Sequence, residues 1–367
     1  MFQDLEMPGI DNSEHRTHYT QMPITLLVLC TSTAVTMLGC LIAYRIGPRF
    51  NALVDNPRTR HHHKQGLPRV GGIALFAGFA VASILAYTQA TPNNPDDARR
   101  IMGVLIGCTV LLPIGLIDDL KELGWVPQLL GQFLVSIIAV FTTVFIERFT
   151  NPLTGNIIEL NILPILGPVL TITFTVLWIV GMMNTVNWLD GLDGLAAGVG
   201  AIASLLFAIH MYKLGQKPVS LYALAMAGAC IGVLPFNFSP ARLFLGSTGA
   251  MILGYSLATL SILAPARVAT ALLVMAVPIA DTGWQIYDRY RNGKSIFKGD
   301  RGHLHFRLID KGYTQIRIVI GYWLACAFFG VISLFVTSQL VKLVVLLVLI
   351  SLTISYISRI SRQNPIL

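Results

Sequence analysis

The chain has 367 residues, of which 54 % are hydrophobic and only 12 % are charged, and its formal net charge is +8. Apolar runs long enough to cross a bilayer recur along its length, so we predict an all-α polytopic membrane protein. The positive charge does not indicate a nucleic-acid partner, because most of the excess lies in short loops where membrane topology requires it. The same charge would attract anionic headgroups and nucleotides.

In chain order, eleven apolar runs predict about 10 or 11 transmembrane helices. The first run is too long, and follows too acidic a segment, to be a cleaved signal peptide. We therefore expect a polar external tail over residues 1–22, one transmembrane domain over 23–360 and a short cytoplasmic tail over 361–367. The runs lie near residues 23–45, 70–90, 100–117, 127–147, 163–183, 194–212, 219–236, 249–264, 268–287, 318–337 and 341–358.

The distribution of Lys and Arg predicts the orientation. With the N-terminus outside and the C-terminus in the cytoplasm, 18 of the 26 basic residues lie on the cytoplasmic side. The cytoplasmic loops then hold nearly all the side chains with catalytic potential. We therefore expect an active site on the cytoplasmic face of the plasma (inner) membrane, acting on a cytosolic compound and a membrane component. These loops cover residues 46–69, 118–126, 184–193, 237–248 and 288–316.

All five cysteines fall inside apolar runs, and none forms a CxxC pair. We expect them to be small buried hydrophobic residues, with no disulfide framework and no zinc site.

A dense polar cluster stands at the end of the fifth run. Asn184, Asn187 and Asp190 are three residues apart, which keeps them on one face of a helix, and Asp193 follows. Polar groups at membrane depth are costly, so four together indicate a site. Amide and carboxylate oxygens suit Mg²⁺, while hydrogen bonding between helices is the alternative.

Other polar groups stand at the ends of neighbouring runs. Asp118 and Asp119 end the third run, where the helix dipole disfavours acidic residues. The pair either holds a divalent cation, supplies a carboxylate that acts as a base, or is simply a solvated helix end. Gly71 and Gly72 open the second run and allow close backbone approach. The segment 246–249 begins a helix whose N–H groups either bind a phosphate or are ordinarily capped.

Two loops are rich in histidine and arginine. In the first loop, residues 61–63 are consecutive histidines, which indicate either a metal site or a solvated basic loop. In the last large loop, His303 and His305 lie beside Arg301 and Arg307. These histidines and arginines would suit the binding of a pyrophosphate. Alternatively, the basic residues of this loop serve only to orient the protein in the membrane.

Together, these segments resemble the polyprenyl-phosphate N-acetylhexosamine-1-phosphate transferases. The bacterial undecaprenyl-phosphate GlcNAc-1-phosphate transferases are the most similar branch, and phospho-N-acetylmuramoyl-pentapeptide transferase is a relative. The resemblance runs from about Asp55 to Gly312, and its most specific element is NxxNxxDGxDGLA at residues 184–196. The aspartate pair, the NFxPAR segment at 237–242 and the DRxHLH loop at 300–305 reinforce it.

The resemblance implies transfer of a sugar-1-phosphate from a UDP-sugar, most simply UDP-GlcNAc, to undecaprenyl phosphate, with Mg²⁺ or Mn²⁺ as cofactor. It implies membrane lipids as partners, suggests a homodimer and involves no nucleic acid. The implied metal ligands are Asn187 and Ser247, the latter at the position of a usual aspartate. The implied catalytic residues are Asp118, Asp119, Asp190 and Asp193, and the implied substrate-binding residues are His63, Asn184, Asn237, Arg301, His303 and His305.

Four positions depart from the family pattern. Ser247 replaces an aspartate, Gln128 and His61 each replace a lysine, and Phe306 replaces a histidine. An active transferase is the leading hypothesis. The alternatives are a non-catalytic relative that keeps the scaffold and a transporter, although a transporter's polar groups should lie nearer the bilayer midplane.

Overall fold

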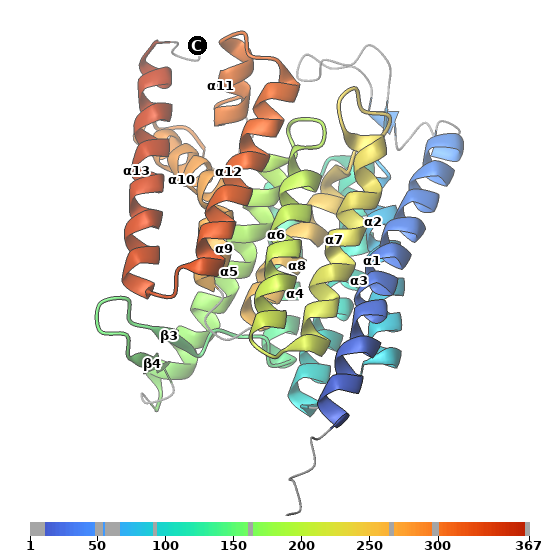
Figure 1. The fold of residues 1–367 in the computed structure, drawn as a ribbon. Coiled ribbons are helices and arrows are strands. Elements are labelled where there is room, and N and C mark those ends of the chain that lie inside the picture. Colours follow the sequence, from blue (N-terminus) through green and yellow to red (C-terminus); the bar gives the residue numbers. More distant parts are fainter. Residues whose placement is uncertain are drawn as a thin grey trace, which may run out of the picture.

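The computed structural model describes residues 12–47, 54–55, 67–90, 94–160, 164–263, 268–295 and 301–363. Within these ranges the chain is almost entirely helical, as predicted (Figure 1). The helices are α1 (Asn12–Ile46), α2 (Gly71–Gln89), α3 (Pro95–Lys121), α4 (Trp125–Phe141), α5 (Leu166–Leu189), α6 (Leu195–Lys213), α7 (Lys217–Asn237), α8 (Gly246–Leu263), α9 (Val268–Val274), α10 (Ala276–Arg291), α11 (Leu304–Asp310), α12 (Gln315–Phe335) and α13 (Gln339–Gln363). Two small antiparallel hairpins pair β1 (Val54–Asp55) with β2 (Leu67–Pro68) and β3 (Arg148–Thr150) with β4 (Ile157–Glu159).

The long helices match the predicted apolar runs. Nine helices in the described ranges are long and apolar enough to cross a membrane, and the bent pair α9–α10 makes a tenth candidate. Helix α4 is apolar but shorter, and with it the count reaches the eleven runs of the sequence. Helix α1 begins at the lower edge of Figure 1 and α13 ends at the upper edge, as an odd number of crossings requires.

Two predicted runs are not single straight helices. The fourth run was expected to continue to residue 147, but α4 ends at Phe141 and the chain turns through Thr143, whose φ is +63°, toward β3. The ninth run bends by 78° between α9 and α10. The break directs α10 away from the axis of α9, and α10 packs against α5 and α13.

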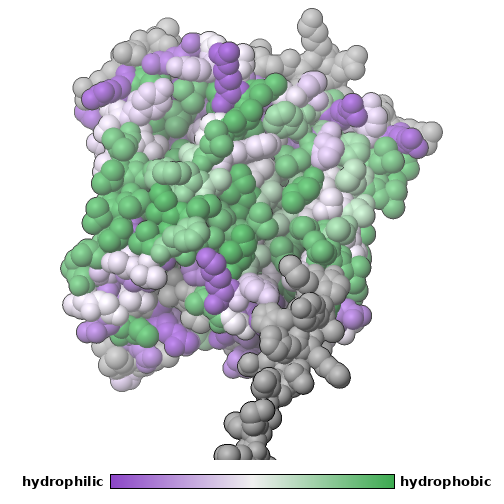
Figure 2. Space-filling model, viewed as in Figure 1, coloured by the Kyte–Doolittle hydropathy of each residue, from purple (hydrophilic) through white to green (hydrophobic). Residues whose placement is uncertain are grey.

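Burial divides the helices into a centre and a periphery. In α6, α7 and α8, 72 %, 78 % and 83 % of the apolar window is buried, against 22 % in α1 and α13. Small residues allow the close packing. Gly228 and Gly232 of α7 lie against α1, and Gly200 of α6 lies against Leu253 of α8. The surface shows an apolar band between two polar edges, as a membrane protein requires (Figure 2).

The start of α2 is held against the loop before α8. The N–H groups of Gly71 and Gly72 donate to the carbonyls of Phe244 and Leu245, at 3.0 and 2.9 Å. This confirms the close approach predicted for the two glycines. The prediction for the cysteines holds for Cys40, Cys108, Cys230 and Cys326, which are buried, but is wrong for Cys30, because α1 is peripheral and exposes it. All five are free thiols.

Candidate active site

The predicted polar residues gather where several helices end on one face of the bundle. Helices α3, α5 and α7 end there, and α6 and α8 begin there, at the upper edge of Figure 1. Helix α11 lies at the same edge. Residues far apart in the sequence therefore meet because five spans alternate in direction.

Asp119 is bound to the N-terminus of α8. Its carboxylate accepts hydrogen bonds from the backbone N–H groups of Ser247 and Thr248, at 2.7 and 3.1 Å, and from the Thr248 hydroxyl at 2.6 Å. Gly246 has a φ of +75°, and a Cβ there would lie 2.8 Å from Oδ2 of Asp119. The N–H groups that the sequence offered to a phosphate are thus occupied by a carboxylate of the same chain, which helix N-termini favour.

Asp118 and Asn184 are each paired with a glutamine of α4. The Gln128 amide donates to Oδ1 of Asp118 at 2.8 Å. Asn184 and Gln132 exchange hydrogen bonds, with the Asn184 amide donating at 2.7 Å. Gln128, one of the four departures from the family pattern, therefore still contacts the aspartate pair but brings no positive charge to it.

The loop between α5 and α6 holds Asp190 and Asp193 in different surroundings. The carboxylate of Asp193 accepts from the N–H of Ala241 at 3.2 Å. The Asn237 carboxamide accepts from Gly194 N–H and donates to the Leu243 carbonyl, so this predicted substrate-binding side chain bridges two loops. Helix α5 ends at Leu189, just before Asp190, and Gly194 directly before α6 adopts a φ of +78°.

Asp190 has no such partners. Its side chain makes no hydrogen bond to the residues that the structure describes. Burial raises the pKa of this carboxyl well above its usual value, and the negative charges of Asp119 and Asp193 raise it further. A buried carboxylate among like charges needs a cation or a proton to be stable.

A magnesium ion at this site would have few protein ligands. Within the described ranges, no three His, Cys, Asp or Glu side chains converge closely enough to hold a metal. Mg²⁺ is commonly held by one or two carboxylates together with water and substrate phosphates. Asn187 and Asp190, three residues apart at the end of α5, make no side-chain hydrogen bonds to the described chain and fit that role. Ser247 brings a neutral hydroxyl beside Asp119.

The histidines of the last loop form an ordered group. Nδ1 of His303 lies 3.1 Å from Oδ2 of Asp281, and the N–H of Leu304 donates to Oδ1 of the same carboxylate at 2.9 Å. The rings of His303 and His305 stack with centroids 5.6 Å apart, and His303 also contacts Trp188 at 5.5 Å. The two predicted histidines therefore lie directly against the end of α5.

His305 is the more unusual of the two. It is fully buried, and neither ring nitrogen has a hydrogen-bond partner among the residues that the structure describes. Burial lowers its pKa to about 3, so the ring is neutral near pH 7. Its Nε2 faces Gly191, where an added Cβ would lie only 2.5 Å away. This nitrogen therefore lies directly against the loop that holds Asp190.

The residues that hold this loop were not predicted from the sequence. Asp281, Gln285 and Arg289 are four residues apart on α10 and are buried. Gln285 and Arg307 both donate to the Gly302 carbonyl, and the Arg289 guanidinium lies 5.7 Å from the Trp188 ring. The signal was available, because three polar residues at this spacing form a stripe along an otherwise apolar run.

The remaining predicted residues are peripheral or undescribed. Arg301 pairs with Asp310 at 2.9 Å and lies over the Phe306 ring at 5.3 Å. Phe306 fills space beside His305, with ring centroids 4.3 Å apart. The three consecutive histidines at 61–63, which include His61 and the predicted substrate-binding His63, lie outside the described residues.

Comparisons with known proteins show which family the chain resembles. The model of glycosyl transferase family 4 matches residues 101–265. The chain is 30 % identical to a probable undecaprenyl-phosphate N-acetylglucosaminyl 1-phosphate transferase of Bacillus subtilis, over 89 % of this chain and 87 % of that protein. It is 33 % identical to the decaprenyl-phosphate N-acetylglucosaminephosphotransferase of Mycobacterium tuberculosis, over 84 % and 81 %.

A third relative is named for a different sugar. The phospho-N-acetylmuramoyl-pentapeptide-transferase of Desulforudis audaxviator is 30 % identical over 76 % of this chain and 86 % of its own length. All three alignments cover most of both proteins. The chain therefore belongs to glycosyl transferase family 4, the membrane-embedded polyprenyl-phosphate N-acetylhexosamine-1-phosphate transferases.

Proposed function

We propose that the protein transfers GlcNAc-1-phosphate from UDP-GlcNAc to undecaprenyl phosphate, forming a lipid pyrophosphate sugar and UMP. The observation that carries the proposal is the Asp190 carboxylate, which makes no hydrogen bond to the described chain and stands three residues after Asn187. The neighbouring Gly191 lies against His305 of the histidine group that α10 holds. Two of the relatives named above are GlcNAc-1-phosphate transferases that use a polyprenyl phosphate, which favours the same sugar here.

The reaction requires one bond to form and one to break. A lipid phosphate oxygen bonds to the β-phosphorus of the UDP-sugar while the bond from that phosphorus to the oxygen bridging the α-phosphate breaks. The electron pair leaves with UMP. The protein has little covalent chemistry to perform in such a transfer, so its side chains mainly position the phosphates and stabilise their charge.

Mg²⁺, or Mn²⁺, would be held by Asn187 and Asp190 and would offset the negative charge of the transferring phosphate. Ser247 is a weaker candidate ligand because its hydroxyl brings no countercharge. Asp118, bonded through one oxygen to Gln128, keeps its other oxygen for a ligand or a proton of the reacting phosphates.

The histidine group would act on the nucleotide side of the reaction. A neutral His305 offers one donor and one acceptor without charge, and His303 is oriented by Asp281. Arg301 supplies a positive charge in the same loop, and its ion pair with Asp310 neutralises part of that charge. These groups suit a pyrophosphate that arrives from the cytoplasm.

The proposal places this face in the cytoplasm and the protein in the plasma membrane. The basic residues of the sequence favour that orientation, with the N-terminus outside. The lipid substrate would then approach from the inner leaflet and the nucleotide sugar from solution.

Purified protein in detergent with undecaprenyl phosphate and Mg²⁺ tests the proposal through UMP release. We expect release with UDP-GlcNAc to exceed that with UDP-GalNAc or UDP-MurNAc-pentapeptide. Asp190→Asn should reduce the rate about 100-fold or more, as loss of a main electrostatic group does, whereas Asp288→Asn, at a half-buried residue of α10 whose carboxylate accepts a hydrogen bond from Asn292, should not. Absence of UMP with all three sugars, beside an active relative as positive control, would refute the proposal.

A further inference from the structure

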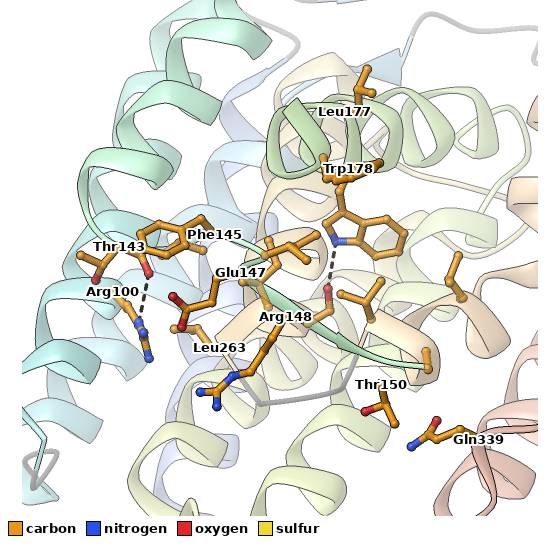
Figure 3. Close-up of a pocket in the computed structure, with 18 residues that line it drawn as sticks. Arg100, Thr143, Phe145, Glu147, Arg148, Thr150, Leu177, Trp178, Leu263 and Gln339 are labelled. Carbon is orange, nitrogen blue, oxygen red and sulfur yellow. Dashed lines mark hydrogen bonds between the residues drawn. The ribbon is translucent and has the colours of Figure 1, made fainter. Parts of the chain in front are cut away.

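A second cavity lies at the opposite end of the bundle from the candidate active site. Its volume is about 570 Å³, and it opens beside the β3–β4 hairpin at the lower edge of Figure 1. The first half of α5, the end of α8, α9 and the hairpin line it (Figure 3). This volume is typical of a ligand pocket, and none of the proposed catalytic residues reaches it.

The cavity has a charged side. Arg100, Glu147 and Arg148 gather there in Figure 3. Arg100 is already engaged, because its Nε donates to the Thr143 carbonyl at 3.0 Å and Nη1 pairs with Asp97 at 3.3 Å. The exposed Arg148 makes no hydrogen bond or ion pair with the residues that the structure describes, so its charge is available to a ligand.

The other side of the cavity is apolar. Phe174, Leu177 and Trp178 of α5 and Leu272 of α9 are among the residues that line it. The Trp178 indole donates to the Ser261 hydroxyl at 3.1 Å and to the Ala258 carbonyl at 3.3 Å, so its polar edge is satisfied by the protein. The rest of the ring is left to contact a hydrocarbon.

The cavity lies at the edge of the apolar band and has the positively charged Arg148 on one side and apolar side chains on the other. This combination matches an amphiphile that carries a negative charge. Arginine and tryptophan at this depth meet lipid headgroups and the upper part of the alkyl chains. We propose that the cavity binds an anionic phospholipid of the leaflet opposite the active site, with its phosphate on Arg148 and alkyl chain carbons against Trp178. The proposal goes beyond the transferase function and does not depend on it.

Quenching of Trp178 fluorescence by brominated lipids tests this binding. The full-length protein in a neutral detergent is titrated with phosphatidylglycerol or phosphatidylcholine brominated near the top of the acyl chains. We expect saturable quenching that is missing in Trp178→Phe and that needs about fivefold less phosphatidylglycerol than phosphatidylcholine, the effect of one basic residue on an anionic lipid. Arg148→Gln should abolish this preference.

Arg99→Gln is the matched control, because Arg99 lies on the same face, donates to the Phe141 carbonyl and does not line the cavity. It should keep the fivefold preference. Ala269→Phe fills the cavity and should remove the saturable quenching. Equal quenching by the two lipids, or an unchanged preference in Arg148→Gln, would overturn the proposal. The proposal would also be overturned if undecaprenyl phosphate, but not unbrominated phosphatidylglycerol, protected Trp178 from quenching by brominated lipid. That result would assign the cavity to a prenyl chain.

Discussion

At the scale of single residues, four similar aspartates have different surroundings. Asp119 accepts three hydrogen bonds at the N-terminus of α8, Asp118 accepts one from Gln128 and Asp193 accepts one from Ala241. Asp190 accepts none from the described chain. The sequence predicted that these residues form a site, but the difference between them depends on contacts with residues 10 to 129 positions away, which a local pattern does not contain.

The raised pKa of Asp190 predicts an unusual pH dependence of stability. The folded protein holds a proton on this carboxyl at a pH where the unfolded chain has lost it. In EDTA, the melting temperature should therefore fall as pH rises through the folded pKa, and Asp190→Asn should remove this part of the dependence. Mg²⁺ should raise the melting temperature of the wild type and not of the variant. Identical behaviour of the two proteins in thermal melts would contradict the role assigned to Asp190.

Asp281 is predicted to position His303. A carboxylate acceptor requires the proton on Nδ1, whereas an asparagine at 281 can donate to Nδ1 and reverse the tautomer. Asp281→Asn should reduce kcat/KM about 10- to 100-fold, by analogy with other carboxylates that orient histidines. Asp281→Glu should recover part of the loss, and Asp288→Asn on the same helix should have no effect. Steady-state kinetics of the three variants decide the point, and unchanged activity in Asp281→Asn would exclude the positioning role.

At the scale of elements, the site depends on where helices end. Residues 184–190 lie at the end of α5 as the three-residue spacing predicted, and the glycines that follow allow the turn into α6. The break between α9 and α10 was not predicted, because hydropathy measures length and composition but not direction. The polar stripe on α10 is the physical reason that this segment leaves the lipid and packs against the histidine loop.

The contact between the α5–α6 loop and α11 can be tested at one glycine. A Cβ at position 191 would lie 2.5 Å from His305 Nε2 and 2.8 Å from Cζ of Phe306. Gly191→Ala should therefore displace the histidine loop and reduce activity at least tenfold, with little global unfolding. In Gly181→Ala on helix α5, the added Cβ meets nothing within 4 Å, so this substitution should be neutral or slightly stabilising. UMP release and thermal melts of both variants measure the difference. Equal activities would show that the loop does not rely on this contact.

At the scale of the whole molecule, the sequence predicted the class of fold well. Every apolar run corresponds to a helix or a bent pair, because spans of about 20 apolar residues have no alternative structure in lipid. The β3–β4 hairpin, α11 and the cavity beside the hairpin were not predicted from the sequence. They arise from loop contacts that leave no periodic pattern in the sequence.

The orientation of the bundle is a further prediction. The excess of basic residues places the candidate active site and the C-terminus in the cytoplasm, with the start of α1 outside. A green fluorescent protein fused after residue 367 should fluoresce, and alkaline phosphatase fused there should be inactive. A phosphatase inserted in the β3–β4 hairpin should be active. The reverse pattern would place the site on the outer face and exclude a cytosolic nucleotide sugar as its substrate.

The central claim is that a sugar-1-phosphate, and not the sugar alone, moves to the lipid. Two batches of UDP-GlcNAc, labelled with ³²P in the α- or the β-phosphate, test it with undecaprenyl phosphate and Mg²⁺. We predict that the β-label enters the lipid product and the α-label is released as UMP, and that Asp190→Asn blocks both transfers. A lipid product without β-label, or no labelled lipid from the native protein, would contradict the account.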